Sequence, residues 1–364
     1  MHPGARRRST WLRAIALAYA LALALIELSR WVGPEQWWLT CLNLYLPQAV
    51  WALPGVLLLL LAFVIDRRLA LVLALCVLWV LGPLMGLVVV FKRATAPPEQ
   101  RLRVMTYNVK YGRGDMREVA AEILAADPDL LLLQDVGSRV TTYPPLAKFL
   151  RTRHVEAEGF YLVASRYPLS PMDYRPMGSD WYVRTRIEDA RFPVAVYNVH
   201  LMTPRDGLQE MRAWSADAVD EILSSAAARL AQVDQLNRDL DRESGPVLLA
   251  GDLNAPPESL VLRRLMSTRL QDAFGAAGRG YGYTYGHTRR PRWSYMRLDH
   301  ILFSPLQPRL RRARQPGRRR RRLGAPSGRG RPRVSRTLSG ASRSKLSRAR
   351  FGRIGARRGD FRML

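Results

Sequence analysis

The chain has 364 residues and a formal net charge of +27, from 57 Lys and Arg against 30 Asp and Glu. Most of the excess lies in residues 306–364, which contain 21 basic residues and one acidic residue, whereas residues 101–305 are close to neutral. The near-neutral region gives no electrostatic support for a nucleic-acid substrate, because phosphate-binding domains usually carry the basic residues themselves.

Three apolar segments fill the first 93 residues: Trp11–Leu28, Leu39–Ile65 and Leu69–Phe91. Each is about 18 residues or longer and almost free of charge, which is long enough to cross a bilayer as a helix. We therefore expect a membrane anchor of three transmembrane helices over residues 1–93. A cleaved signal peptide is the alternative for the first segment, and buried core helices are the alternative for the other two.

Basic residues flank the anchor unevenly. They flank the start of the first apolar segment at positions 6–8 and 13 and recur in the turn at 66–68, whereas the loop at 29–38 has one Arg and three Trp. The positive-inside rule then places the chain in an inner or plasma membrane, with the region after the anchor outside the cytoplasm. Lys92 and Arg93 oppose this orientation. Residues 94–100, with two adjacent prolines, are expected to form a short stiff linker.

Residues 101–305 alternate between strand and helix patterns, which predicts an α/β domain. Leu102–Val109 alternates, Leu130–Val136 is a continuous apolar run, and the long polar, Ala-rich stretch Asp206–Arg242 is mostly helical. Both cysteines lie before this region, so it contains no disulfide framework or thiolate metal site. Further strands are expected at 161–164, 181–187, 192–200 and 247–250.

Short polar motifs follow four of the apolar runs, and a fifth motif opens the last run. Strand ends are where polar side chains can converge on a ligand while the strand bodies stay buried, so we expect one assembled site. The motifs are Thr106–Asn108, Leu133–Asp135, Asn198–His200, Gly251–Asn254 and Arg297–His300.

In this order the motifs resemble those of the endonuclease/exonuclease/phosphatase superfamily. The resemblance implies a four-layered α/β sandwich over residues 101–305 and a metal-dependent phosphoesterase. Asn108 and Asp135 match the metal-site positions of the family, and oxygen ligands of this kind imply Mg²⁺ or Mn²⁺. The family acid is normally Glu. Because Asp is one methylene shorter, the metal would have to shift or bind through water.

The resemblance also implies the catalytic residues. His200 matches the strand-end histidine that contacts the scissile phosphate. Asp252 and Asn254 match the pair that orients the nucleophilic water or the leaving group, and Asp299 matches an acid that orients a later histidine. That later histidine, in a Ser-Asp-His motif, is missing, because the last of the five histidines is His300. His300 is adjacent to Asp299 on a strand and should therefore face away from the site.

Residues 306–364 are rich in Arg, Gly, Ala, Pro and Ser and are expected to be a disordered tail. Two accounts of this segment compete. A basic tail could bind nucleic acid or anionic lipid. Alternatively, the reading frame slips near Pro305, where the last strand and the missing histidine should follow.

The sequence thus predicts a membrane-anchored phosphoesterase whose activity is weakened by the missing histidine. Its substrate would be a phosphodiester or phosphomonoester in nucleic acid, a phospholipid head group or a small molecule. The alternative is a non-catalytic membrane protein that uses the fold and the basic tail to bind nucleic acid or anionic lipid. The sequence leaves the oligomeric state open.

Overall fold

The computed structural model describes residues 3–91, 102–213, 215–267, 269–286, 294–304 and 310–311. The predicted linker at 94–100 lies outside these ranges. So does the predicted tail at 306–364, apart from the two-residue strand β13 (Leu310–Arg311).

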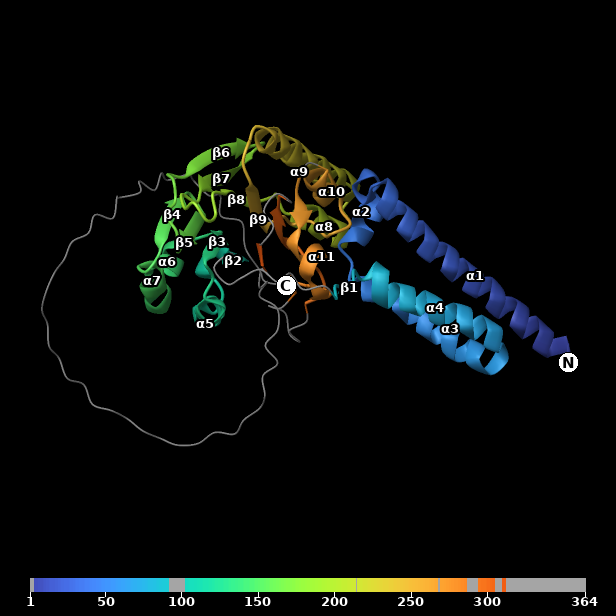
Figure 1. Cartoon of the computed structure of the whole chain (residues 1–364). Helices are drawn as coiled ribbons and strands as arrows, with labels where there is room; N and C mark the ends of the chain where they lie inside the picture. Colours follow the sequence, from blue (N-terminus) through green and yellow to red (C-terminus); the bar gives the residue numbers. More distant parts are fainter. Residues whose placement is uncertain are drawn as a thin grey trace, which may run out of the picture. The chain divides into compact units, whose positions relative to one another are not determined.

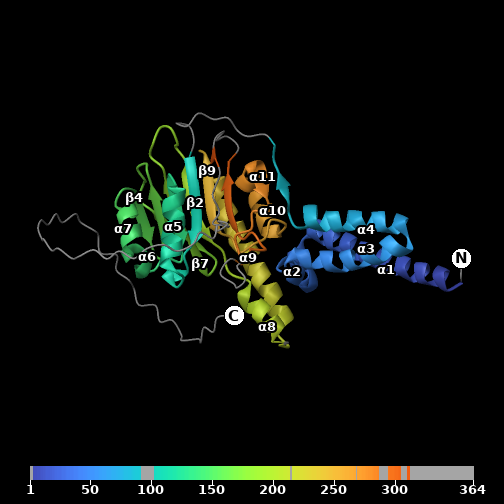
Figure 2. The same cartoon turned by 90° about the horizontal axis from the view of Figure 1, so that it is seen from below.

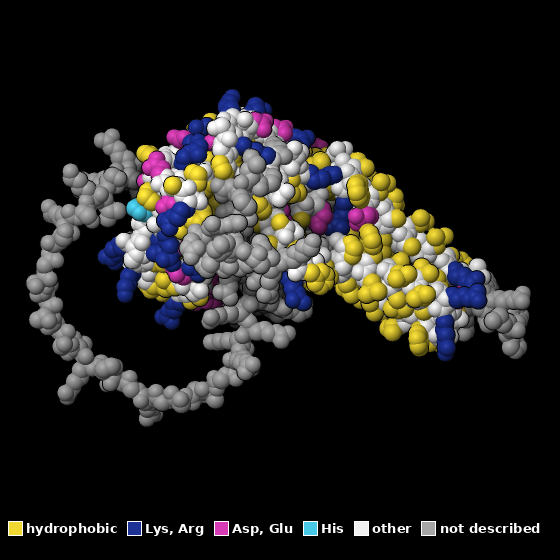
Figure 3. Space-filling model, in the orientation of Figure 1, with side chains coloured by type: hydrophobic (Ala, Val, Ile, Leu, Met, Phe, Trp, Pro, Cys, Tyr) yellow, Lys and Arg dark blue, Asp and Glu magenta, His cyan; other side chains and the backbone are white. Residues whose placement is uncertain are grey.

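Three helical segments at the N-terminus are long and apolar enough to cross a membrane: Ser9–Val32, Gln48–Ile65 and Arg67–Leu84. They contain helices α1 (Pro3–Val32), α3 (Ala52–Ile65) and α4 (Arg67–Trp79). Their outer surfaces expose many large apolar side chains, and these helices are covered by yellow apolar atoms in Figure 3. A surface of this kind is stable in contact with lipid and costly in contact with water.

The second and third spans are shorter than the apolar runs that predicted them. The second begins at Gln48 rather than Leu39, because Pro47 separates it from a short helix, α2 (Trp38–Leu44). Cys41 and Leu44 of α2 are buried against the α/β domain and not exposed like the spans. The third span ends at Leu84, and the residues after it form strand β1 (Val88–Val89), which pairs with β11 (Arg279–Gly280).

Two mixed β-sheets form the centre of the α/β domain, as Figures 1 and 2 show. The six-stranded sheet has the order β10-β12-β9-β8-β7-β6, and the five-stranded sheet has the order β13-β2-β3-β5-β4. Their strands are β2 (Leu102–Asn108), β3 (Leu130–Gln134), β4 (His154–Glu158), β5 (Tyr161–Ser165), β6 (Asp173–Met177), β7 (Asp180–Arg186), β8 (Ala195–His200), β9 (Val247–Asp252), β10 (Gln271–Asp272) and β12 (Asp299–Phe303).

Helices cover the outer faces of both sheets. The helices of the domain are α5 (Met116–Ala126), α6 (Ser138–Thr142), α7 (Pro144–Leu150), α8 (Arg205–Arg212), α9 (Ala218–Asp241), α10 (Leu260–Met266) and α11 (Ala273–Ala277), and short helical turns lie at η1 (Pro34–Gln36), η2 (Gln48–Trp51), η3 (Val80–Leu84) and η5 (Lys110–Gly112). Helix α5 starts where the Asp115 side chain accepts a hydrogen bond from Arg117 N, and it ends at Asp127 in the left-handed conformation.

Three apolar cores hold the layers together and confirm the predicted four-layered sandwich. Leu132, Val196 and Leu248 belong to the core between the two sheets. A second core joins the five-stranded sheet to α5 and α7, and a third joins the six-stranded sheet to α9 and α10. Strand β3 is buried on both faces, which explains why its sequence is an unbroken run of leucines.

Candidate active site

Five strands bring polar residues to one edge of the two sheets. Strands β2 and β3 are parallel, and their register places Asn108 beside Gln134. Strands β8 and β9 are also parallel, with His200 beside Asp252, and β12 runs antiparallel to β9 with Asp299 opposite Asp252. The motifs that follow the apolar runs therefore meet at one place.

Side chains from the two sheets contact each other directly at this edge. Asn108 Nδ2 donates a hydrogen bond to Asp252 Oδ2 at 3.1 Å. His200 lies between two carboxylates, with its Nδ1 3.3 Å from Asp135 Oδ1 and its Nε2 3.9 Å from Asp252 Oδ2. These four side chains form a partly exposed cluster that mixes one imidazole, one amide and two acids.

Two buried amides lie beneath the cluster and hold the sheets together. Gln134 Nε2 donates to Asn198 Oδ1 at 2.6 Å, and Asn198 Nδ2 donates to the Leu133 carbonyl at 2.9 Å. Both side chains are fully buried. Both residues lie inside two of the polar motifs, but the sequence predicts no role for them. Their signal was a polar residue within an otherwise apolar strand, which must find a partner when buried.

The backbone around the cluster adopts a rarely populated conformation. Five non-glycine residues of the described chain have positive φ, and four of them are at this site: Lys110, Tyr111, Asp135 and Asn254, with φ of 48°, 57°, 53° and 47°. Each such residue costs about 1–3 kcal/mol and persists only where its surroundings enforce it. Strain of this kind gathers at functional sites, and here it accompanies a hydrogen bond from Tyr111 N to the Asp135 carbonyl.

His200 carries a positive charge at neutral pH. Burial by itself lowers the pKa of His200, but the hydrogen bond to Asp135 and the negative charges of Asp252 and Asp299 outweigh burial and raise the pKa to about 9. The imidazolium therefore presents an N–H on both ring nitrogens. A fixed cation beside an open edge suits the binding of a phosphate oxygen.

Asp135 is held as a carboxylate. Burial raises its pKa, but hydrogen bonds to His200, Asn108 and Tyr111 lower it by more, so the net shift is downward. Burial and the Asp135 charge raise the pKa of Tyr111 to about 12, so its hydroxyl stays protonated and donates to the acid. The sequence analysis did not identify Tyr111, which follows the first motif on a turn that carries no distinctive pattern.

Asp299 shows the opposite pKa shift to Asp135. Burial and the nearby Asp252 raise the pKa of Asp299 to about 7, although a hydrogen bond to Thr284 opposes the shift. Asp299 thus titrates near neutrality, and two facing acids share one edge of the site.

Two further polar residues of the motifs, Asn254 and His300, face inward. Asn254 is buried, and its Nδ2 donates to the Leu201 carbonyl at 2.8 Å, so its side chain links the ends of β8 and β9. His300 is fully buried and its Nε2 lies 2.8 Å from the Ala255 carbonyl. Burial and Arg297 lower the pKa of His300 to about 3. A neutral, enclosed His300 agrees with the prediction that it faces away from the site.

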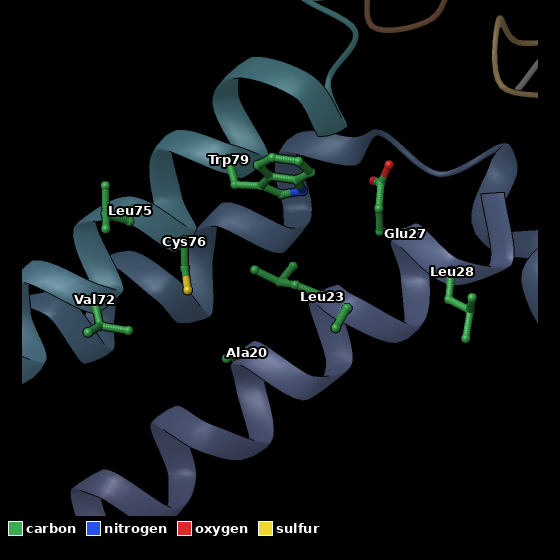
Figure 4. A pocket seen from close by; sticks show the side chains of 9 residues that line it. Ala20, Leu23, Glu27, Leu28, Val72, Leu75, Cys76 and Trp79 are labelled. Carbon is green, nitrogen blue, oxygen red and sulfur yellow. The ribbon is translucent and has the colours of Figure 1, made fainter. Parts of the chain in front are cut away.

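The apolar helices form a cavity away from this site. It is a groove of about 580 Å³ between α1 and α4, lined by Leu23, Val72, Leu75 and other apolar side chains (Figure 4). Its titratable lining residues are Glu27 and Cys76, which do not supply the groups needed to bind a phosphate. The groove belongs to the apolar helices and not to the polar strand ends.

The chain shows likeness to known proteins. The family described as Endonuclease/Exonuclease/phosphatase family matches residues 105–327, which is more than half of the chain. A search of curated proteins finds no match. Solved structures with a similar fold include truncated TDP2 from Caenorhabditis elegans, at 20% identity over 56% of this chain and 84% of that chain, with a TM-score of 0.41.

Sphingomyelinase C from Streptomyces griseocarneus is 18% identical over 56% of this chain and 83% of its own, with a TM-score of 0.40. A β-hairpin deletion mutant of β toxin from Staphylococcus aureus is 12% identical over 65% of this chain and 99% of its own, with a TM-score of 0.43. These names describe what the chain is similar to. By the extent of the family match, the chain belongs to the endonuclease/exonuclease/phosphatase family.

Proposed function

We propose that the chain is a membrane-anchored, metal-dependent phosphoesterase whose catalytic residues are His200, Asp252 and Asp299, with Asn254 positioning Asp252. The observation that carries this proposal is the convergence of His200 with Asp252 and Asp135 across two sheets. The imidazolium and the acids are the groups that phosphoryl transfer needs, because the reaction requires charge stabilisation and a positioned nucleophile.

The donor set fits a hard divalent cation. Asn108 and Asp135 offer oxygen atoms, and among the described residues no group of three or more His, Cys, Asp or Glu is arranged to hold a metal ion. A site with few protein ligands suits Mg²⁺ or Mn²⁺, because Mg²⁺ keeps several water molecules and does not require a cage of side chains. Bound by Asn108 and Asp135, the metal would neutralise charge on the phosphoryl group.

The chain's own residues would divide the remaining work. His200 would donate an N–H to a non-bridging phosphate oxygen and stabilise the charge that develops there. Asp252 would accept a proton from the attacking water and orient it. Asn254 would keep Asp252 in place, because Asn254 N donates to Asp252 Oδ1 at 3.0 Å. Candidate substrates are nucleic acid, a phospholipid head group and a phosphorylated small molecule, and the anchor favours lipid slightly.

The test is hydrolysis of bis(p-nitrophenyl) phosphate and p-nitrophenyl phosphate by the full chain in detergent, with Mg²⁺, with Mn²⁺ and with EDTA. We expect EDTA to abolish turnover, and His200→Gln and Asp252→Asn to lower it by about 10²-fold or more. The matched control is Asp189→Asn, which alters a partly exposed acid that is paired with Arg191 away from the site, and it should leave turnover unchanged. Equal turnover in the parent and in both site variants would contradict the proposal.

Metal binding is tested separately by calorimetry with Mn²⁺. Asp135→Ala should abolish the binding heat, whereas Asp189→Asn should retain it. Undiminished affinity in Asp135→Ala would remove that residue from the metal site.

A second candidate is a non-catalytic membrane protein that keeps the fold for binding, with the Arg-rich segment contacting nucleic acid or anionic lipid. The absence of any histidine after His300 in the sequence favours it. The two candidates differ in metal-dependent hydrolysis, which the second one lacks.

A further inference from the structure

The segment between the first two membrane spans reaches the candidate catalytic loop. Tyr45 follows α2, and its hydroxyl donates a hydrogen bond to the Asn254 carbonyl at 3.1 Å, although the two residues are 209 positions apart. Tyr45 is buried at 9% exposure. Tyr45 is therefore part of the interior of the α/β domain and does not lie at a membrane–water interface.

Arg229 of α9 completes the contact. Its side chain is fully buried, and its Nη1 donates both to the Tyr45 hydroxyl and to the Asn254 carbonyl. The guanidinium also lies 5.4 Å from the centroid of the Tyr45 ring. Burial of a cation is costly, and Nη1 is the one guanidinium nitrogen of Arg229 with hydrogen-bond partners among the described residues, so loss of these contacts would be unfavourable. The contacts therefore link Arg229, Tyr45 and Asn254.

The same segment is held at two further places. Cys41 and Leu44 share an apolar core with Ile222 of α9 and with Leu298, which precedes Asp299. Ahead of them, the Glu35 carboxylate is buried and accepts the Leu260 N–H at 2.9 Å, at the start of α10. The segment from η1 to Tyr45 thus contacts both ends of the loop that joins β9 to α10.

A shift of Asn254 would be transmitted to the catalytic side chains. Asn254 holds a strained left-handed backbone, its N–H donates to Asp252 Oδ1, and its side-chain amide donates to the Leu201 carbonyl, next to His200. Tyr45 and Arg229 hold the Asn254 carbonyl in place. They therefore also hold the Asn254 N–H and side-chain amide in the positions that contact Asp252 and Leu201. Without that support, the strain could relax by rotation of the Asn254 peptide.

We propose that Tyr45 is a positioning residue for the catalytic loop at 252–254 and acts through Arg229 and the Asn254 carbonyl. The N-terminal region would then help to hold the active-site residues in position, in addition to anchoring the domain to the membrane. The catalytic consequence rests on the proposed function, whereas the structural consequence stands without it.

The experiment compares full-length Tyr45→Phe with the parent in the same detergent by hydrogen–deuterium exchange. The variant keeps the ring and loses only the hydroxyl. The Leu253 and Asn254 amides donate to Leu298 O and Asp252 Oδ1. Loss of the Tyr45 hydroxyl should let these hydrogen bonds open more often, so we expect both amides to exchange at least about tenfold faster. Amides in β3, which lies in the other sheet, should not change.

Tyr281→Phe is the matched control. It removes a hydrogen bond of the same kind between the domain and the anchor, from the Tyr281 hydroxyl to the Leu81 carbonyl at 2.7 Å, without touching the catalytic loop. Exchange at Leu253 and Asn254 should be unchanged in this variant. Unchanged exchange in Tyr45→Phe, or an equal increase in both variants, would overturn the proposal.

Kinetics add a readout that loss of stability alone would not give. At a temperature where both variants are folded, Tyr45→Phe should lower kcat about tenfold with KM nearly unchanged, whereas Tyr281→Phe should alter neither. A change in KM with kcat intact would count against positioning. A parent with no hydrolysis would contradict the proposed function, and the exchange result would still decide the role of Tyr45.

Discussion

The raised pKa of Asp299 makes the stability of the folded protein depend on pH. Its carboxyl group is partly buried opposite Asp252 on the neighbouring strand, and burial together with that acid raises its pKa to about 7. The folded protein therefore holds a proton that the unfolded chain releases near pH 4. The stability contributed by this group is complete below pH 4 and is lost as the pH rises to 7.

Replacing this acid should stabilise the protein in alkaline buffer. In EDTA, we expect Asp299→Asn to melt several degrees above the parent at pH 8 and at the same temperature at pH 4, because the amide cannot ionise. Thermal unfolding monitored at several pH values measures the effect. A variant that is less stable than the parent at pH 8 would show that the buried carboxylate has compensating partners.

Sequence reasoning located Asn108, Asp135, His200 and Asp252 because each follows an apolar run, and strand ends meet by the geometry of parallel sheets. It did not locate Tyr45, whose contact depends on two segments 209 positions apart. A contact between such distant segments produces no pattern of apolar and polar residues in either of them. A tyrosine within an apolar run is equally compatible with contact with lipid and with burial in protein.

At the scale of elements, the close approach of β9 to β8 depends on Gly251. Its φ is 157°, and a Cβ added there would lie 1.7 Å from the Val199 carbonyl oxygen. No side chain fits at that distance, so only glycine allows the parallel register that places His200 beside Asp252.

Gly251→Ala should therefore disrupt the domain more than a typical substitution does. We expect a loss of more than about 3 kcal/mol of stability, or failure to fold, because the clash is with backbone in the centre of a sheet. Gly114→Ala is the control, since a Cβ at Gly114 meets nothing within 4 Å. Denaturant unfolding of both variants measures the difference, and equal stability would refute this account of Gly251.

The apolar run at 39–65 shows where element prediction fails. Hydropathy identifies segments that avoid water, but it does not distinguish burial in lipid from burial against protein. Residues 48–65 form a helical segment long and apolar enough to cross a membrane, whereas α2 packs on α9, and only Pro47 between them marks the change. The body of the α/β domain was predictable, because strands such as β3 and helices such as α5 have strong periodicity.

The predicted orientation depends on which side of the membrane the basic flanks occupy. Arg13 of α1 and Asp66, in the turn between α3 and α4, form an ion pair at 2.6 Å, so the basic N-terminal flank and that turn lie at the same end. We expect an enzyme reporter that is active only outside the cytoplasm to be active when fused after Pro305. Activity of a cytoplasm-only reporter at the same junction would reverse the orientation.

For the molecule as a whole, the edge of the five-stranded sheet is relevant to whether the reading frame slips near Pro305. Within the described residues, β13 pairs only with Leu102 and Arg103, so the rest of β2 has no strand on that side. An open edge of this kind is normally covered. Translating the same DNA in the other two frames should recover a Ser-Asp-His or similar triplet and an apolar strand within about 30 residues.

Restoring that frame should raise hydrolysis by about 10²- to 10⁴-fold, because a positioned acid–base group contributes that much. It should also raise the melting temperature. If neither frame encodes such a triplet, the Arg-rich segment is an authentic extension of the chain.

The contact between Tyr45 and Asn254 also sets an order of events during biosynthesis. The inter-span segment emerges from the ribosome 209 residues before the carbonyl that it contacts. At about 5–20 residues per second, the delay is on the order of 10–40 s. During that time Tyr45 and the acid Glu35 have been synthesised but lack Asn254 and Leu260, the residues that they contact in the folded chain. The loop at 252–254 therefore takes its final shape only after the segment that it contacts has been made.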